Sequence, residues 1–373
     1  PIFQVQCDVR DLWFDESGSR LASVQRGRQA GWLDLSRSSE FQEMIVASFG
    51  TWVDRCEFSA DGRMVAGGFS RQVDIRRVSD GRPLAEIPIG GLPVFAFDPQ
   101  GAGLVTSDPR GIQHYAFEEE GPERIKMHLP RRVIRGGRWR SLAFSGDGQY
   151  FFAGNTDSNM VYVFNRAITR WIGTLGPHPA VDALAVTRDG SRVATGSSTK
   201  RDVRVWDRAS GSELFATSMS LQSRIALSPD GHWLLVHGDR LELVDLLTRQ
   251  PSSPLQFPGG WPLAGAACFS SDSRVLAVVV DQYEVQLFDL MERRALGRLR
   301  TPQETRMVAL AFSPDASSLA AATSQGRLRV WNLARIRQRL AEVKLDWEGI
   351  PFPATVKAPD VFTLERESGA ADP

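Results

Sequence analysis

The chain is poor in the residues that crosslink small scaffolds or ligate metals. Its 373 residues include three cysteines, at positions 7, 56 and 268, and five histidines. The cysteines have no paired spacing, so we expect buried free thiols and no disulfide framework. The histidines form no H-x-x-x-H or H-E-x-x-H arrangement, and we expect neither a metal nor a cofactor in the protein.

Sequence motifs of catalysis are also missing. The chain has no G-x-S-x-G nucleophile elbow, no G-x-G-x-x-G motif and no phosphate loop that ends in Lys and Ser or Thr. We therefore expect that the protein is not an enzyme.

Long apolar runs are absent as well, because none approaches the length of a transmembrane helix and no signal peptide is recognisable. These observations favour a cytoplasmic protein without a membrane partner. The formal net charge is zero, from 44 cationic and 44 anionic residues, which argues against general binding to polyanions. Lysine occupies only positions 126, 200, 344 and 357, so nearly all of the cationic residues are arginine.

What the chain does contain is a repeat, which is clearest in its last copy, MVALAFSPDASSLAAATSQGRLRVWNL at 307–333. Short apolar segments separated by turn residues at a period of about forty predict an all-β fold, a single propeller of four-stranded blades. The longest interval between turns runs from Gln100 to Asp147. The eight copies are marked by turn residues at Ser17, Asp61, Gln100, Asp147, Asp189, Asp230, Asp272 and Asp315.

Each copy begins with a strand that has one large face. Large apolar residues stand three and five positions before most marks, as at Phe144 and Leu142, and a small residue such as Ala143 stands between them. A spacing of two places the large pair on one face. Such a strand suits the inner edge of a blade, where sheets converge. A second apolar run follows each turn, and a third run alternates apolar with polar residues, which is typical of strands.

The third run carries a family resemblance. VRVWD at 203–207 and LRVWN at 328–332 resemble WD-repeat units, and the resemblance extends over roughly residues 9–333. In the other copies a different residue replaces the tryptophan, so those copies are degenerate.

In that family, a hydrogen-bonded set of Asp, His, Ser or Thr, and Trp often braces a blade. The fifth copy offers His178, Thr195 or Ser197, and Trp206, but its turn aspartate is displaced to Asp202. We therefore do not expect a complete brace in any copy.

Closure of the ring requires one more strand. The eighth copy runs from Trp331 directly into a helical pattern and offers no fourth strand. An N-terminal strand that pairs with the last blade would remove an open sheet edge. We therefore expect residues 1–6 to form the closing outer strand and the ring to have eight blades. Seven blades, with one copy lost to a flanking element, is the alternative, and the third copy is the most eroded.

The expected organisation is a propeller over residues 1–333, an amphipathic helix over 334–347 that packs on it, and a Pro-rich surface segment over 348–373 with a disordered tail from Glu365. Leu333, Ile336, Leu340, Val343 and Trp347 fall at helical spacing, opposite Arg335, Arg337, Arg339, Glu342 and Lys344. A propeller followed by such a tail resembles the C-terminal halves of bacterial multidomain proteins in which a WD-repeat array is attached to a protein kinase or a protease.

The densest charge cluster lies in the longest interval. One interpretation is a site for an anion or an acidic partner, because guanidinium groups pair with carboxylate and phosphate. The other, which we favour, is a solvated loop whose charges pair with the upstream Glu118, Glu119, Glu120 and Glu123. The cluster consists of Arg131, Arg132, Arg135, Arg138 and Arg140, with Trp139 among them.

Further candidates lie in loops on the face where the innermost strands begin. Exposed Trp and Arg dominate the energetics of interfaces. The candidate partner-binding residues are therefore Trp52, Arg71, Trp261 and Arg306, in addition to the arginine cluster and Trp139.

The sequence thus favours a binding module, a scaffold or regulatory platform that holds a protein or peptide on its face. The partner could be a catalytic domain of the same or a companion chain. Binding of nucleic acid or another polyanion through residues 131–140 is a second hypothesis. A metal-dependent enzyme, with a site in the central channel assembled from residues distant in sequence, is a third.

Overall fold

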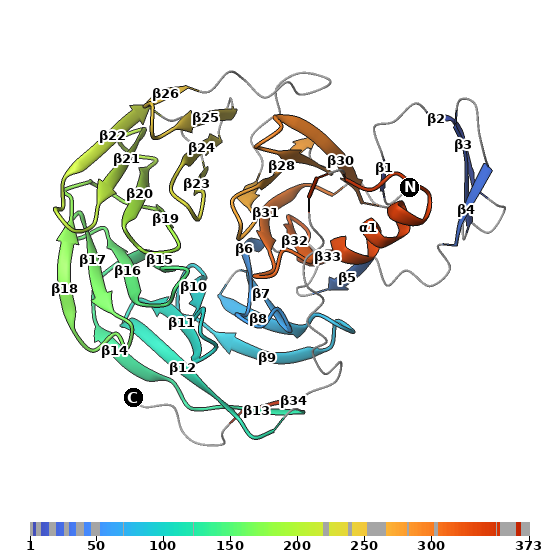
Figure 1. Cartoon of the computed structure of the whole chain (residues 1–373). Helices are drawn as coiled ribbons and strands as arrows, with labels where there is room; N and C mark the ends of the chain where they lie inside the picture. The colour runs from blue at the N-terminus through green and yellow to red at the C-terminus, as the bar shows by residue number, and fades with distance from the viewer. Residues whose placement is uncertain are drawn as a thin grey trace.

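Seven sheets surround a common centre in the described part of the chain, so the fold is a β-propeller (Figure 1). The computed structural model describes residues 3–4, 9–14, 20–25, 30–34, 41–45, 53–69, 71–121, 123–218, 224–237, 241–251, 266–281, 283–301, 305–347, 349–350 and 363–366.

Each blade is built from antiparallel strands that follow one another outward from the centre, as predicted. Blade 1 contains β6 (Val53–Phe58), β7 (Met64–Phe69), β8 (Gln72–Arg77) and β9 (Pro83–Pro88). Blade 2 contains β10 (Val94–Phe97), β11 (Gly103–Asp108), β12 (Gly111–Glu119), β13 (Arg124–Met127) and β14 (Arg131–Arg135). Blade 3 contains β15 (Trp139–Phe144), β16 (Tyr150–Asn155), β17 (Met160–Asn165) and β18 (Trp171–Leu175).

The remaining blades follow the same order. Blade 4 contains β19 (Ala183–Val186), β20 (Arg192–Ser197), β21 (Asp202–Asp207) and β22 (Glu213–Ser218). Blade 5 contains β23 (Arg224–Leu227), β24 (Trp233–His237), β25 (Leu241–Asp245) and β26 (Gln250–Pro251). Blade 6 contains β27 (Ala267–Phe269), β28 (Val275–Asp281), β29 (Glu284–Asp289) and β30 (Arg294–Arg300), and blade 7 contains β31 (Met307–Phe312), β32 (Ser318–Thr323) and β33 (Arg327–Asn332).

The closing strand is not the one expected from the sequence. The fourth strand of blade 7 is β5 (Phe41–Ile45), which pairs antiparallel with β33. The first strand, β1 (Phe3–Gln4), instead pairs with β30 at the outer edge of blade 6. The prediction that residues 1–6 form the outer strand of the last blade is therefore wrong. The strand that covers the free edge of β33 is β5, which lies closer in sequence to blade 1.

The preferred blade count is wrong for the same reason. Because β5 pairs with blade 7, the first repeat keeps only β2 (Val9–Phe14), β3 (Arg20–Gln25) and β4 (Ala30–Asp34), which form a separate sheet. Figure 1 shows this sheet beside the ring. The described ring thus has seven blades, the alternative that the sequence left open, and the copy outside it is the first, not the eroded third.

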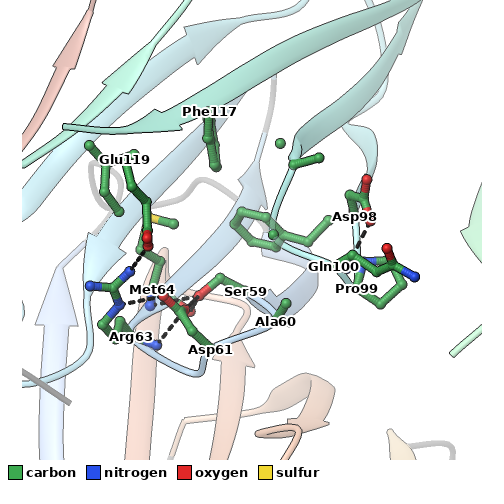
Figure 2. A pocket seen from close by; sticks show the side chains of 15 residues that line it. Ser59, Ala60, Asp61, Arg63, Met64, Asp98, Pro99, Gln100, Phe117 and Glu119 are labelled. Atoms are coloured by element: carbon green, nitrogen blue, oxygen red, sulfur yellow. Dashed lines mark hydrogen bonds and ion pairs between the residues drawn. The ribbon is translucent and has the colours of Figure 1, made fainter. Parts of the chain in front are cut away.

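The turn after the innermost strand explains the marks in the sequence. In blade 1, Ser59 Oγ donates to Asp61 Oδ1 over 2.6 Å and accepts from the backbone N–H of Met64 over 2.9 Å (Figure 2). Asp61 Oδ1 also accepts from the backbone N–H of Arg63 over 3.0 Å. The same three contacts recur in the described turns of blades 3 to 7, at Ser145–Asp147, Thr187–Asp189, Ser228–Asp230, Ser270–Asp272 and Ser313–Asp315.

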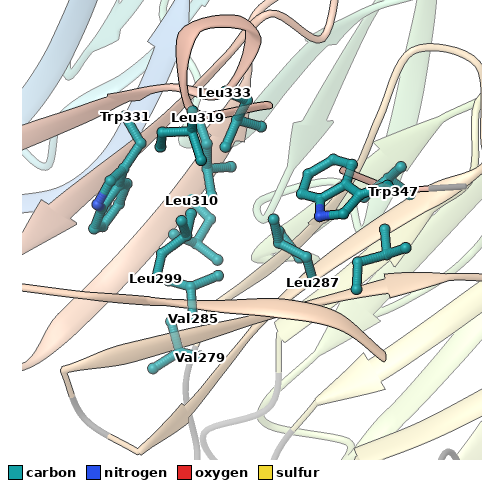
Figure 3. Close-up of a cluster of buried hydrophobic side chains, with 14 of the residues drawn as sticks. Val279, Val285, Leu287, Leu299, Leu310, Leu319, Trp331, Leu333 and Trp347 are labelled. Atoms are coloured by element: carbon teal, nitrogen blue, oxygen red, sulfur yellow. The ribbon is translucent and has the colours of Figure 1, made fainter. Parts of the chain in front are cut away.

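After blade 7 the chain forms the helix α1 (Leu333–Glu342), capped by Asn332, whose Oδ1 accepts from Arg335 N over 2.9 Å. Leu333, Ile336 and Leu340 join the apolar cluster between blades 6 and 7, which also buries Trp347 (Figure 3). The helix ends five residues before Trp347 because Lys344 has a φ of 59°.

Two details of this C-terminal segment differ from the expectation. Arg337, expected on the solvent face, is 3% exposed; it donates to both carboxylate oxygens of Asp346 and lies 4.9 Å from the ring centroid of Trp347. The chain also forms a further strand, β34 (Thr363–Arg366), which pairs parallel with β13. Glu365 and Arg366 are therefore ordered partners of blade 2, where disorder was expected.

Candidate functional site

The longest repeat interval forms an extended blade 2. The nine-residue strand β12 pairs with β14 along its first half and with β13 along its second half. Most of the arginine cluster therefore lies on a strand, since Arg131, Arg132 and Arg135 all belong to β14. Arg138 follows in the loop that leads into β15, on the face where the innermost strands begin, which we call the top face.

The upstream glutamates do not neutralise this cluster. Glu118 pairs with His128, Glu119 with Arg63 and Glu120 with Arg124. Within the described residues the one ion pair of the cluster joins Arg138 Nε to Asp157 over 3.7 Å, where both side chains are largely exposed. The expectation that the cluster is a self-neutralised loop is therefore wrong.

Unpaired charge remains on the surface as a result. Arg131, Arg135 and Arg140 are exposed, and Arg132 is half-buried. In the described part of the chain none of them has an anionic side chain as a partner. This segment can accept carboxylate or phosphate groups without breaking an existing ion pair.

Trp139 is a wall of the site and not an exposed anchor. It is 8% exposed, its Nε1 donates to the carbonyl of Gly136 over 2.6 Å, and its ring meets Tyr162 edge-on at 5.5 Å. The tight approach explains the glycine at position 137, where φ is 86° and a Cβ would lie 2.9 Å from Trp139 Nε1.

A groove of about 360 Å³ runs between the outer strands of blades 2 and 3. Arg135 stands at one wall, and Trp171 at the other wall is 57% exposed while its ring packs on Tyr162 at 5.6 Å. Ile172, the next residue, is also exposed at 44%. The principal lining side chains are Ile134, Arg135, Trp139, Tyr162, Phe164 and Trp171.

Trp171 was not among the residues predicted from the sequence, because those residues belong to loops of the top face and to the arginine cluster. Trp171 and Ile172 are adjacent on β18, an outer strand, so their large apolar side chains point to opposite faces of the sheet. That pair was the available signal.

The other candidate residues do not gather at this groove. Arg71 lies between β7 and β8 in blade 1, and Arg306 lies just before β31 in blade 7; both are exposed. Trp52 and Trp261 lie outside the described residues.

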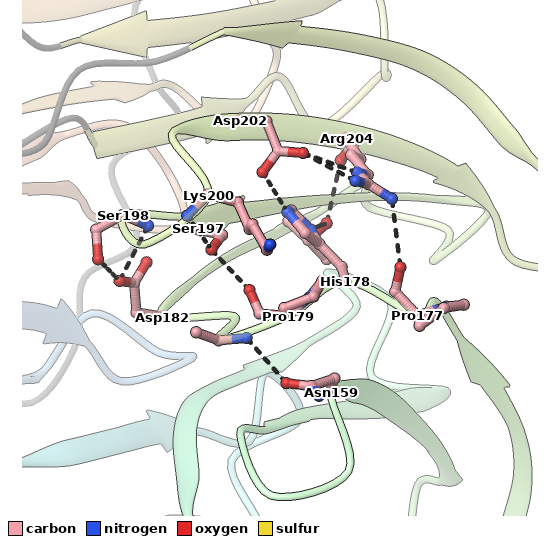
Figure 4. A network of polar contacts seen from close by, with 12 residues as sticks. Asn159, Pro177, His178, Pro179, Asp182, Ser197, Ser198, Lys200, Asp202 and Arg204 are labelled. Atoms are coloured by element: carbon pink, nitrogen blue, oxygen red, sulfur yellow. Dashed lines mark hydrogen bonds and ion pairs between the residues drawn. The ribbon is translucent and has the colours of Figure 1, made fainter.

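Blade 4 contains the hydrogen-bonded brace that the sequence analysis did not expect to be complete. Trp206 Nε1 donates to Thr195 Oγ1 over 2.8 Å, and Thr195 Oγ1 lies 2.6 Å from His178 Nδ1. His178 Nε2 lies 2.8 Å from Asp202, and Figure 4 shows Arg204 on the other side of that carboxylate. The displacement of the aspartate to the start of β21 therefore preserves the network.

The protonation state of this brace follows from burial. Burial lowers the pKa of His178 and outweighs the raising effect of Asp202, so the imidazole is neutral near pH 7. Burial alone would raise the pKa of Asp202, but hydrogen bonds from His178 and Arg204 outweigh it and lower that pKa. A neutral histidine can accept a hydrogen bond from Thr195 and donate one to Asp202. This arrangement is structural and contains no reacting group.

Chemistry at other polar groups is limited. No group of three or more His, Cys, Asp or Glu side chains in the described residues is placed to hold a metal. Burial raises the pKa of the free thiol of Cys56 to about 12 and that of Cys268 well above its ordinary value. Neither is a thiolate near pH 7. Cys7 lies outside the described residues.

Among the described residues, no helix has the length and apolarity to cross a membrane.

The ring of similar blades and the tryptophan-centred brace define a repeat-built β-propeller. Two segments, residues 170–207 and 296–332, match the family model described as WD40, WD domain, G-beta repeat. Each matched segment begins on or before the outer strand of one blade and ends on the third strand of the next. The chain is a WD-repeat β-propeller. A comparison with curated proteins gave no match.

Proposed function

We propose that this propeller is a non-catalytic platform that binds an acidic protein or peptide along the groove between blades 2 and 3 and the adjoining arginine segment. Propellers of the WD40 family generally mediate protein–protein interaction and are typically non-catalytic. The observation that carries the proposal is the exposed Trp171 opposite Arg135 across one groove.

The composition of the groove supports this choice. Trp, Tyr and Arg are the residues that most often dominate binding energy at interfaces. A partner's apolar side chain would contact Trp171 and Tyr162, while its carboxylates would pair with Arg135 and its exposed neighbours. Arginine suits this role because its planar guanidinium binds a carboxylate through two parallel hydrogen bonds.

The test is chemical crosslinking in cells that express the chain, followed by identification of the partners. The double variant Trp171→Ala with Arg135→Ala should lose the partners that the unaltered chain captures. Met291→Ala is the matched control, because Met291 is 74% exposed on blade 6 and distant in sequence from the groove. Equal capture by the double variant, with its thermal unfolding unchanged, would reject this surface.

The polyanion hypothesis stays a distinct alternative with its own result. A random-sequence oligonucleotide would then bind with an affinity that falls steeply as salt increases. Binding would also be lost when Arg131, Arg135, Arg138 and Arg140 are replaced by alanine. These two results, together with no captured protein, would support polyanion binding and reject the proposed binding of an acidic protein.

A further inference from the structure

The outer edge of blade 2 is covered along only half of its length. Its outer strand consists of β13 and β14, which follow each other along the chain and both pair with β12. β34 pairs parallel with β13, from Thr363 beside Arg124 to Arg366 beside Met127. In the described part of the chain, no strand pairs with the outer edge of β14. A free strand edge presents N–H and C=O groups that can pair with a further strand.

The pairing of β14 with β12 shows which backbone groups lie on that edge. Arg135 stands opposite Gly111. The N–H of the next residue, Gly136, donates to the carbonyl of Arg110 over 2.7 Å. In an antiparallel ladder the backbone groups of successive residues point to opposite sides of the strand. The N–H and C=O of Arg135 therefore point away from β12, toward the open edge, where an added strand could bind them.

This molecule already contains an example of a strand that adds to an arginine-bearing edge. β5, which is far away in sequence, pairs with β33, and Glu43 stands opposite Arg329 with its carboxylate on that guanidinium. Two residues from Glu43, Phe41 packs on Trp331 with ring centroids 5.6 Å apart. Residues two apart in a strand share one face. An acid on an arginine and an aromatic ring on a tryptophan thus accompany the backbone pairing of β5.

β14 and the groove beside it offer the same two kinds of group. Arg135 is exposed, and across the groove between blades 2 and 3 lies the exposed ring of Trp171. Among the described residues no anionic side chain pairs with Arg135. The arginine-rich outer strand β30 differs on both counts, because β1 pairs with it and Glu284 binds Arg298 and Arg300. β14 therefore combines an open edge with a charge that can accept an anion.

We propose that the partner binds this surface as an extended strand along the outer edge of β14, with a carboxylate on Arg135 and an apolar side chain of the same strand face in the groove against Trp171. This inference rests on the proposed function, because it uses the same groove, and it adds the conformation and the side-chain pattern of the partner segment. Backbone hydrogen bonds to a sheet edge provide affinity, and the alternate side chains provide specificity. A partner that binds as a helix would leave the N–H and C=O of Arg135 without that pairing.

The test uses the full chain and the peptide acetyl-Thr-Glu-Thr-Phe-Thr-Glu-Thr-amide, which places two acids and an aromatic ring on one strand face. Hydrogen–deuterium exchange of residues 131–137 is followed by mass spectrometry. Exchange in this segment should slow about tenfold at saturation, because the added strand hydrogen-bonds the outward N–H groups. The outer strand β22 of blade 4 also ends its sheet but carries no arginine, so its exchange should not change.

Two matched peptides separate the contributions of the backbone and of the acids. The analogue that is N-methylated at its five central residues keeps every side chain but cannot donate to β14, and it should bind about tenfold more weakly. The analogue with glutamine at both acids should also bind about tenfold more weakly, because it loses charge-assisted hydrogen bonds to Arg135. Equal affinity of either analogue and the original peptide would overturn the inference.

The remaining outcomes distinguish this inference from the proposed function. Binding that is lost in the double variant Trp171→Ala with Arg135→Ala, but leaves the exchange of residues 131–137 unchanged, would overturn strand addition and leave the acidic-partner groove in place. Absence of saturable binding would also overturn the inference. The proposed function is rejected separately, by equal capture of partners in cells by the double variant and the unaltered chain.

Discussion

Two tryptophans at the same repeat position have different surroundings. In blade 4, Trp206 Nε1 donates to Thr195. In blade 7, Trp331 is fully buried, and within the described residues its Nε1 has no hydrogen-bond partner. The register explains the difference: Ala321 pairs with Leu310 and Arg329 in blade 7 as Thr195 pairs with Leu184 and Arg204 in blade 4. Alanine therefore stands where the acceptor is needed.

This comparison gives a prediction with opposite signs in the two blades. Ala321→Ser should increase the free energy of unfolding by about 1 kcal/mol, because it gives a buried donor its acceptor. Thr195→Ala should decrease it by about 2 kcal/mol, because Trp206 Nε1 and His178 Nδ1 both lose their partner. Denaturant unfolding measures both values.

Two neighbouring substitutions serve as controls. Ala322→Ser places a hydroxyl on the other face of β32, away from Trp331, and should destabilise the chain. Thr217 in blade 4 makes no hydrogen bond through its hydroxyl among the described residues, so Thr217→Ala should change stability little. If Ala321→Ser and Ala322→Ser destabilise equally, the acceptor argument fails.

At the scale of the element, the closing strand is fixed by charge as well as by backbone pairing. Glu43 on β5 accepts from Arg329 Nε over 2.6 Å and also pairs with Arg327. The Arg329 side chain is 0% exposed, and burial lowers its pKa against the raising effect of Glu43. A guanidinium in that position needs an anion, and β5 supplies it.

Glu43→Gln should therefore lower the free energy of unfolding by about 2–3 kcal/mol, since it leaves a buried cation without its counterion. Chemical denaturation followed by tryptophan fluorescence reports the change. Glu342→Gln is the control, because the pair of Glu342 with Arg339 is exposed and contributes little. A similar effect in both variants would mean that backbone pairing alone holds β5.

At the scale of the whole molecule, one position of the innermost strand differs between the blades. Blade 1 has an acid there, whereas the other described blades have alanine or cysteine. Glu57 lies on the innermost strand β6 and accepts from Phe97 N over 3.2 Å, while its Oε2 is buried without a hydrogen bond. Burial raises the pKa of Glu57 to about 7, although Arg55 and the Phe97 N–H oppose the shift. Burial likewise raises the pKa of Asp74 in the same blade to about 6.

These shifts predict that the contribution of Glu57 and Asp74 to stability falls as pH rises. An acid whose pKa is higher in the folded state than in the unfolded state binds its proton more tightly when folded. Its contribution is complete below the ordinary value of 4.5 and is lost as pH rises through about 7. Thermal unfolding at about pH 5 and about pH 8 should show a smaller difference for Glu57→Gln than for the unaltered chain. An identical difference in both would show that Glu57 does not titrate in this range.

Local patterns predicted much of each blade. The strand order, the turn at each Ser/Thr-x-Asp and the helix after Leu333 follow from spacing and from bonds between near neighbours in sequence. The groove was only partly predictable. Arg135 and Trp139 were identified by composition, but the position of Trp171 across the groove from Arg135 was not, because it depends on the packing of blade 3 against blade 2.

The sequence by itself determined that the chain is a repeat of four-stranded units, since the period, the alternation and the turn residues act over a few positions. Tertiary structure decided how many units enter the ring. Whether β1 or β5 closes blade 7 depends on contacts between residues almost 300 positions apart, such as Glu43 with Arg329. Local spacing contains no information on that choice, because any strand could satisfy the free edge of β33. The buried charge of Arg329 favours the strand that carries an acid.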